Sequence, residues 1–288
     1  MHPAVKQRYG LGLRRPFYQS ASAGQIPVDW FEVITENFMV AGGKPIRILE
    51  SVRNHYPIVL HGVSMNLGGT DPLDQKYLTA LKTMVDRFQP MWVSDHLCWT
   101  RFGGQSFHDL LPLPYTQEAV ENTANRIRVV QDFLQQQILI ENVSSYLEFK
   151  HNTLIEAEFL AAVTERADCR ILLDINNIVV NATNHGIDSS EYLSTIPADR
   201  VGQYHMAGHS KQGRLAIDTH DHSISSEVLN LYKEAVVQLG NAATLLEWDD
   251  QIPTVPILLQ ELDKIRCAAT IHKTAIDFKP LKESGNEN

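Results

Sequence analysis

The feature that most constrains this chain is a pattern that recurs along the whole sequence. A short run of apolar residues is followed by a longer stretch of mixed composition, and then the next apolar run begins. Short continuous apolar runs are typical of strands that are buried on both faces, as in a parallel sheet. The sequence therefore predicts eight strands, at residues 11–14, 30–34, 57–60, 91–94, 137–140, 170–173, 201–204 and 244–246.

Helices are predicted between the strands, because apolar residues there recur every three or four positions. In the stretch that starts at Pro72, for example, Leu78, Leu81 and Val85 would lie on one face of a helix. Asp71 directly before Pro72 is typical of a helix start, with an N-cap residue followed by proline at the first helical position. The clearest predicted helices cover residues 72–88, 116–136, 155–167 and 225–239.

Eight strands that alternate with helices predict an α/β protein with a closed (β/α)8 barrel, the TIM-barrel fold class. The 288 residues suit one such barrel, although length alone also allows two domains. An open doubly wound sheet is the runner-up, but Gly10 and Gly12 after the first apolar residues do not have the spacing of a GxGxxG phosphate loop. We expect a single barrel domain at residues 1–278 and a polar tail at residues 279–288.

The charge and the cysteine content of the chain limit which partners it can bind and in which cell compartment it can work. The formal net charge of −9 and the pI of about 5.7 give no basic field for a nucleic acid. The three cysteines, Cys98, Cys169 and Cys267, are odd in number and widely spaced, which argues against a disulfide framework and favours a reducing compartment. There is no signal-peptide core and no apolar run of about 18 residues. We expect a cytoplasmic protein with no membrane or nucleic-acid partner.

Side chains that can bind metal ions follow six successive predicted strands, the third to the eighth. They are His61; Asp95 and His96; Glu141 and Asn142; Asp174 and Asn176; His205 and His209; and Glu247, with Asp218 and His220 between the last two strands. The carboxyl ends of barrel strands share one face, where barrel active sites lie. Carboxylates that converge there repel one another unless protons or cations intervene. The pattern therefore predicts a metal centre at this face.

The donor types narrow the choice of metal. Imidazole and carboxylate ligands without a nearby thiolate suit iron, manganese or catalytic zinc rather than a structural zinc site. A central carboxylate such as Glu141 can bridge two ions. Each residue also has a simpler interpretation: a lone histidine after a strand is more often structural, and Asp174 or Asn176 can cap the next helix. His108 lies in a predicted loop, either lining the pocket or pointing away from it.

Six motifs occur in a fixed order along the chain: HGVSMNLGG from His61, SDHLCW from Ser94, HDLLPLPY from His108, IENVSSYLEF from Ile140, LLDINNIVVNATNHG from Leu172 and QYHMAGH from Gln203. Together they resemble the multinuclear non-haem iron-dependent oxidative enzymes. Members of that family include the oxidase of methanobactin biosynthesis and an enzyme that excises a β-carbon from a peptide C-terminal cysteine. The resemblance covers roughly residues 10–250 and implies a barrel like that of xylose isomerase.

The resemblance also implies a cofactor of two or three iron ions, of mixed Fe(II) and Fe(III), although zinc or manganese can occupy such sites in an isolated protein. Carried over residue by residue, it implies three ligand sets: His61, His96 and Glu141; Glu141 as a bridge with Asp174, His205 and Glu247; and Asn176, Asp218 and His220. No catalytic residue beyond these ligands is implied. Four more residues are candidates to orient the ligands or to touch the substrate: Asp95, His108, Asn142 and His209.

The activity implied is an O2-dependent modification of a ribosomally made precursor peptide at cysteine, in natural product biosynthesis, with a small partner protein that presents the peptide. One alternative is a divalent-metal sugar isomerase or phosphodiesterase on the same barrel. The net charge argues mildly against a nuclease, and no lysine immediately follows a predicted strand as an isomerase would need. The other alternative is a non-catalytic metal-binding or peptide-carrier protein, which would consume no O2.

Overall fold

Eight parallel strands form a closed barrel in a computed structural model that describes residues 8–276. Around the barrel the order is β1, β2, β3, β4, β7, β8, β9 and β12, and β12 pairs with β1 to close the ring. The bounds are β1 Tyr9–Gly12, β2 Trp30–Ile34, β3 Ile58–Gly62, β4 Val93–His96, β7 Leu139–Glu141, β8 Arg170–Asp174, β9 Val201–Met206 and β12 Ala243–Leu246. The predicted (β/α)8 fold class is confirmed.

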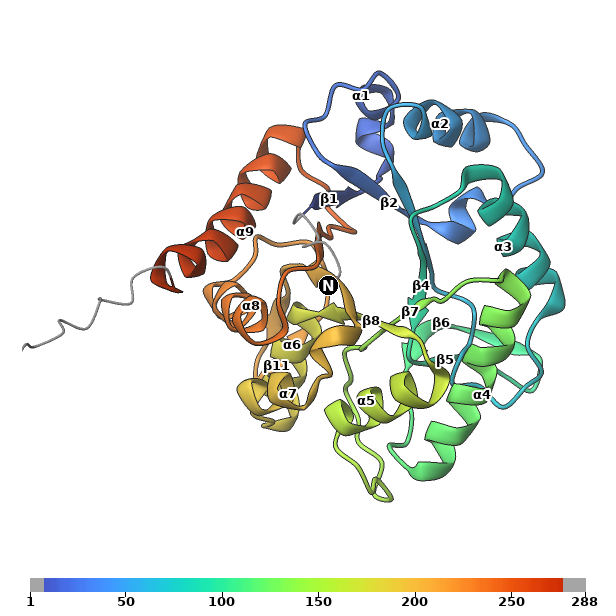
Figure 1. The fold of residues 1–288 in the computed structure, drawn as a ribbon, viewed down its shortest axis with the longest axis vertical. Coiled ribbons are helices and arrows are strands. Elements are labelled where there is room, and N and C mark those ends of the chain that lie inside the picture. The colour runs from blue at the N-terminus through green and yellow to red at the C-terminus, as the bar shows by residue number, and fades with distance from the viewer. Residues whose placement is uncertain (1–7, 277–288) are drawn as a thin grey trace, which may run out of the picture.

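Helices form an outer ring around the strands (Figure 1). The longer helices bury one apolar face; in α3, for example, Leu78, Leu81 and Val85 are buried. The α-helices are α1 Tyr18–Ser22, α2 Lys44–Arg53, α3 Gln75–Phe88, α4 Gln117–Leu134, α5 Glu156–Ala167, α6 Ile175–His185, α7 Ser189–Thr195, α8 Ser226–Leu239 and α9 Val255–Ile276, and the 3-10 helices are η1 Arg15–Phe17, η2 Thr35–Phe38 and η3 Ala198–Arg200.

The four predicted helices are α3, α4, α5 and α8, but the predicted start of the first is wrong. Its N-cap is Asp74, whose side chain accepts hydrogen bonds from the backbone N–H groups of Lys76 and Tyr77. The carboxylate of Asp71 instead accepts hydrogen bonds from two glycine N–H groups in the turn of a hairpin far along the chain. Asp71, which the local sequence predicts as a helix N-cap, therefore binds the hairpin turn through a long-range contact instead.

The predicted strand ends are also shifted. The first strand lies at Tyr9–Gly12 rather than at 11–14, and several others run on beyond the last apolar residue. The strands β4, β7 and β8 thus end in His96, Glu141 and Asp174 themselves. The backbone of these polar residues is still hydrogen-bonded in the parallel ladder, which fixes where their side chains point.

Two antiparallel hairpins rise from the barrel. One joins β5 Trp99–Phe102 to β6 Gln105–Leu111, and the other joins β10 Ser210–Gln212 to β11 Leu215–Ile217. The predicted loop around His108 is therefore wrong, because this residue lies in β6. The turn of the first hairpin is Gly103–Gly104, and both glycines have positive φ angles, of 58° and 78°. A Gly-Gly pair between two apolar segments is a hairpin signal in the sequence.

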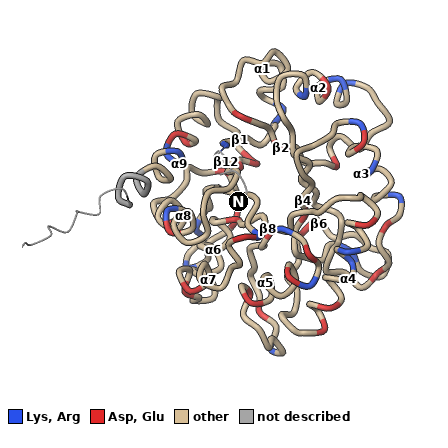
Figure 2. Tube along the Cα trace, viewed as in Figure 1, with Lys and Arg blue, Asp and Glu red and all other residues tan. Residues whose placement is uncertain are grey.

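Acidic positions lie on the ring of barrel strands as well as on the outer helices (Figure 2). Within residues 8–276, no helix is long and apolar enough to span a membrane. The single-domain boundary at residue 278 stays a prediction, and the polar tail predicted at residues 279–288 lies outside the described residues.

Candidate metal centre

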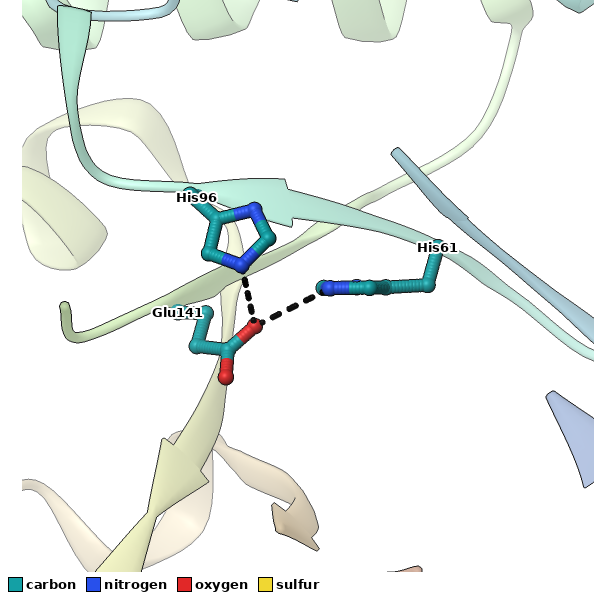
Figure 3. Close-up of side chains that lie close together, drawn as sticks. All are labelled: His61, His96 and Glu141. Carbon is teal, nitrogen blue, oxygen red and sulfur yellow. Dashed lines mark ion pairs between the residues drawn. The ribbon is translucent and has the colours of Figure 1, made fainter. Parts of the chain in front are cut away.

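Two histidines converge on one oxygen of a glutamate at the carboxyl end of the barrel (Figure 3). His61 comes from β3, His96 from the end of β4 and Glu141 from the end of β7. The Nε2 atoms of His61 and His96 each lie 3.3 Å from Oε2 of Glu141, and all three side chains are buried. These are three neighbouring strands of the ring, so the barrel itself creates the group.

The opposite ring nitrogens determine what the Nε2 atoms can do. Nδ1 of His96 lies 3.0 Å from the carbonyl oxygen of Gly62, which only accepts hydrogen bonds, so Nδ1 carries a proton and a neutral ring has its lone pair on Nε2. Nδ1 of His61 lies 2.8 Å from Oγ of Ser94, and burial, with the neighbouring histidines, holds the pKa of His61 well below its usual value. The lone pair of His96, and that of His61 in the tautomer whose Nδ1–H donates to Ser94, point at a carboxylate oxygen that has no hydrogen-bond partner among the described residues. A cation between them would satisfy all three atoms.

The other oxygen of Glu141 belongs to a second group. Nδ1 of His205 lies 3.1 Å from Oε1 of Glu141, 3.0 Å from Oε2 of Glu247 and 4.0 Å from Oδ2 of Asp174. Asp174 also caps α6, because its Oδ1 accepts the N–H of Asn177 at 2.7 Å. Its Oδ2 stays buried without a hydrogen-bond partner within the part of the chain that the structure describes. Glu141 therefore faces two groups of donors, one with each oxygen.

A third group lies beside the first two. Nδ2 of Asn176 donates a hydrogen bond of 2.8 Å to Oδ1 of Asp218, and Nε2 of His220 lies 2.5 Å from the same oxygen. His209 contacts this group from outside, with its Nδ1 2.9 Å from Oδ1 of Asn176. The structure thus brings together all nine residues that the sequence singled out as ligands; that they bind metal stays a prediction.

The two remaining buried candidates orient their neighbours. Asp95 accepts hydrogen bonds from the backbone N–H groups of His96 and Met65, at 2.7 and 3.1 Å. Burial raises the pKa of Asp95 to about 7 despite the opposing effect of His96. Asn142 accepts the backbone N–H of Asp174 and donates to its carbonyl, at 2.8 and 2.9 Å, which ties β7 to β8.

Reasoning from the sequence missed three residues that touch the centre. Arg14, just after β1, pairs with Asp249 and lies 3.8 Å from Glu247. Asp249 in turn lies 3.2 Å from Nδ1 of His220, and Glu32 of β2 lies 3.1 Å from Nε2 of His205. A charged residue inside the apolar run WFEVI was the available signal for Glu32, because an ionisable side chain is seldom fully buried unless it is paired.

A cavity of about 410 Å³ opens onto the centre. Its inner wall carries ligand candidates such as His61 and Glu141, and its outer wall includes Phe107, His108 and Asp109 of β6. His108 therefore lines the pocket. Because residues of both β6 and the barrel strands line the cavity, a substrate there would contact the hairpin and the barrel.

The charge balance at this end of the barrel favours cations. Carboxylates crowd the centre: Glu32, Glu141, Asp174, Asp218, Glu247 and Asp249. In the part of the chain that the structure describes, Arg14 is the only lysine or arginine that forms an ion pair with them. Burial lowers the pKa of Arg14, but Asp249 and Glu247 raise it further, so the guanidinium stays charged. Bound metal ions would neutralise the remaining negative charge.

Metal ions are therefore expected to stabilise the fold. Zn²⁺ at a hundredfold excess over its Kd would add about 2.7 kcal/mol per site, which raises the Tm of a domain this large by about 4–5 °C per site. Differential scanning calorimetry of chelator-treated protein, with and without Zn²⁺, measures the shift. Mg²⁺ is the matched control, because it prefers oxygen ligands and leaves imidazoles unsatisfied. An equal shift with both ions, or none with either, would contradict a mixed imidazole and carboxylate site.

The sequence as a whole matches a family model described as RiPP precursor modification enzyme MbnB/TglH/ChrH, over residues 8–270. The chain belongs to this family. The resemblance inferred from the six motifs is thereby confirmed, and the protein is an enzyme of a family that modifies precursor peptides. A UPF0276 protein of Anaeromyxobacter sp. (strain Fw109-5) is 49% identical over 268 residues, which is 93% of this chain and 94% of that protein.

Solved structures similar to this MbnB/TglH/ChrH-family chain support the fold alone. An L-ribulose 3-epimerase matches with a TM-score of 0.64 and 13% identity, over 97% of this chain and 100% of that one. A xylose isomerase domain protein of Alicyclobacillus acidocaldarius matches with a TM-score of 0.59 and 14% identity, over 92% and 100%. The barrel is therefore of the xylose-isomerase-like type, as the motifs implied.

Proposed function

We propose that this enzyme is a multinuclear non-haem iron oxidoreductase that uses O2 to modify a ribosomally synthesised precursor peptide at cysteine. The observation that carries the proposal is Glu141, whose two buried oxygens face two different groups of histidine and carboxylate donors. One carboxylate shared by two such groups is the arrangement that holds two ions side by side. Membership of a precursor-modifying family supports the peptide as substrate.

The ligand sets proposed are the ones that the fold brings together. They are His61, His96 and Glu141 for one ion; Glu141, Asp174, His205 and Glu247 for a second; and Asn176, Asp218 and His220 for a third. Mixed nitrogen and oxygen donors without thiolate suit iron, and also zinc or manganese in protein isolated without iron. When bound, iron ions of mixed valence would supply open positions for a substrate thiolate and for O2, together with the electrons for its reduction.

The chain itself binds and shields the reacting groups. The barrel holds the ligands on strand ends that are fixed by backbone ladders, so they need little rearrangement when the substrate arrives. On the opposite wall, Phe107 and His108 of β6 would contact the peptide and limit access of water. The proposal includes a small partner protein that presents the peptide. It also includes a cytoplasmic location, with which the three free cysteines are consistent.

Anaerobic protein from iron-57 medium tests the proposal. Mössbauer spectra should contain at least two magnetically coupled iron ions. O2 uptake should occur with a peptide that contains cysteine and should not occur with its serine analogue. Only one zinc or manganese, with no coupled iron after iron loading, would overturn the iron assignment. Sugar isomerase and phosphodiesterase substrates would then be tested on the same protein, since these are the alternative activities of such a barrel. Coupled iron without O2 uptake on any cysteine peptide would indicate a metal-binding carrier.

A further inference from the structure

Four side chains form a continuous hydrogen-bonded chain inside the barrel, ending at the metal centre. Nε1 of Trp92, next to the start of β4, donates to Oε1 of Gln203 at 2.5 Å. Nε2 of Gln203 donates to Oε2 of Glu32 at 2.7 Å, and Glu32 meets Nε2 of His205 at 3.1 and 3.2 Å through its two oxygens. Glu32, Gln203 and His205 are all buried.

The direction of every hydrogen bond in this chain follows from its first member. An indole N–H only donates, so the amide oxygen of Gln203 must face Trp92 and its NH2 group must face Glu32. That NH2 group only donates, so Oε2 of Glu32 must accept. A carboxylate whose two oxygens lie at nearly equal distances from Nε2 of His205 is arranged to accept the proton of that nitrogen.

The opposite nitrogen of His205 then faces the centre. Nδ1 lies within 4.0 Å of carboxylate oxygens from three strands, those of Glu141, Asp174 and Glu247. His61 and His96 have the reverse orientation, with Nε2 towards Glu141 and Nδ1 towards the protein. The three histidines that contact Glu141 therefore do not present the same ring nitrogen to it.

We propose that Glu32 is a positioning residue: it holds the Nε2–H of His205, so that His205 binds metal through Nδ1 while His61 and His96 bind through Nε2. Trp92 and Gln203 keep Glu32 in the accepting state. The inference rests on the metal centre of the proposed function, but not on iron or on O2. A carboxylate behind a ligating histidine fixes its ring and strengthens it as a ligand, and loss of such a partner typically costs 10–100-fold in metal affinity.

Zinc titration with a chromophoric chelator tests this role without any turnover. E32M should lower the affinity for one zinc ion about 10–100-fold and leave the others unchanged. W92F, which removes only the first donor, should have a smaller effect. E36M is the control, because Glu36 is a half-buried glutamate whose hydrogen bonds come from Tyr77 and the N–H of Val63 and not from His205. Wild-type affinity in E32M, or an equal loss in E36M, would overturn the assignment.

A second readout follows the proton itself. In cobalt-substituted protein, a ring N–H near the ion gives a hyperfine-shifted proton signal that disappears when the proton exchanges with water. Wild type and E32Q, whose amide oxygen can still accept this proton, should both give the signal of Nε2–H of His205, which should be absent in E32M. The signal of Nδ1–H of His96, which donates to Gly62, should remain in all three proteins. E32Q also keeps the test valid if E32M does not fold.

A crystal structure of the zinc-loaded protein should have Nδ1 of His205 on the ion. Nε2 on the ion, or Glu32 itself as a ligand in the group that it forms with His61 and Glu247, would refute the inference. Failure of the iron proposal alone would leave these zinc and cobalt results unchanged, so the two ideas are tested separately.

Discussion

Replacement of Glu141 by glutamine is expected to remove the coupled metal pair and to abolish peptide modification. Oε2 of Glu141 lies 3.3 Å from the histidine pair of β3 and β4, and Oε1 lies 3.1 Å from His205. An amide keeps one oxygen and places an NH2 group, which is no ligand, on the other side. It also removes one negative charge from the centre. We expect turnover to fall by more than the roughly 10–100-fold that loss of an outer hydrogen-bond partner costs, and to approach the background rate.

Metal analysis and Mössbauer spectra of iron-57-loaded E141Q measure this loss directly. E36Q is the control, because Glu36 accepts both of its hydrogen bonds, from Tyr77 and from the N–H of Val63, at the single oxygen Oε1. A glutamine at position 36 keeps that oxygen, so E36Q should retain coupled iron. An E141Q protein that holds the same coupled iron as wild type would show that Glu141 is not the bridge, and would redirect attention to Asp174 or Glu247.

The ligand candidates could be found from sequence because residues at the ends of neighbouring barrel strands lie close together in space. His96, Glu141 and Asp174 each end a strand, and neighbouring parallel strands end at the same face. The order of apolar runs was therefore enough to bring residues together that lie far apart in the chain. The same reasoning gave the class of fold, since only the alternation of runs mattered and not their exact bounds.

Reasoning from the sequence could not identify residues whose role depends on a hydrogen-bond partner that is distant along the chain. Glu32 lies inside an apolar run, and only the structure brings His205 and Gln203 to it from β9. Asp71 has all the local features of a helix cap, yet its carboxylate binds the turn at Gly103 and Gly104. In both cases a long-range hydrogen bond outweighs a local preference, and local preferences are weak enough for this to be common.

Substitution of Gly208 by alanine is expected to damage both stability and the third ligand group. Gly208 follows β9, two residues beyond its end, and a Cβ there would overlap the backbone carbonyl of His222 and crowd that of Ser223. Backbone atoms cannot move aside as a side chain can, so the segment that contains His222 must shift. Overpacking of this kind costs about 1–3 kcal/mol, which lowers Tm by several degrees in a domain of this size.

The functional part of this prediction follows from the same segment. Asp218 and His220 lie just before His222, and Nε2 of His220 is 2.5 Å from Asp218, so a displaced segment separates them from Asn176. G202A is the matched control on the same strand, since its new Cβ would meet only the flexible ends of Leu139 and Arg170. Zinc stoichiometry should fall by one in G208A and stay unchanged in G202A. Full stoichiometry in a destabilised G208A would contradict this prediction, because binding of the third ion would then not depend on the position of the segment that carries Asp218 and His220.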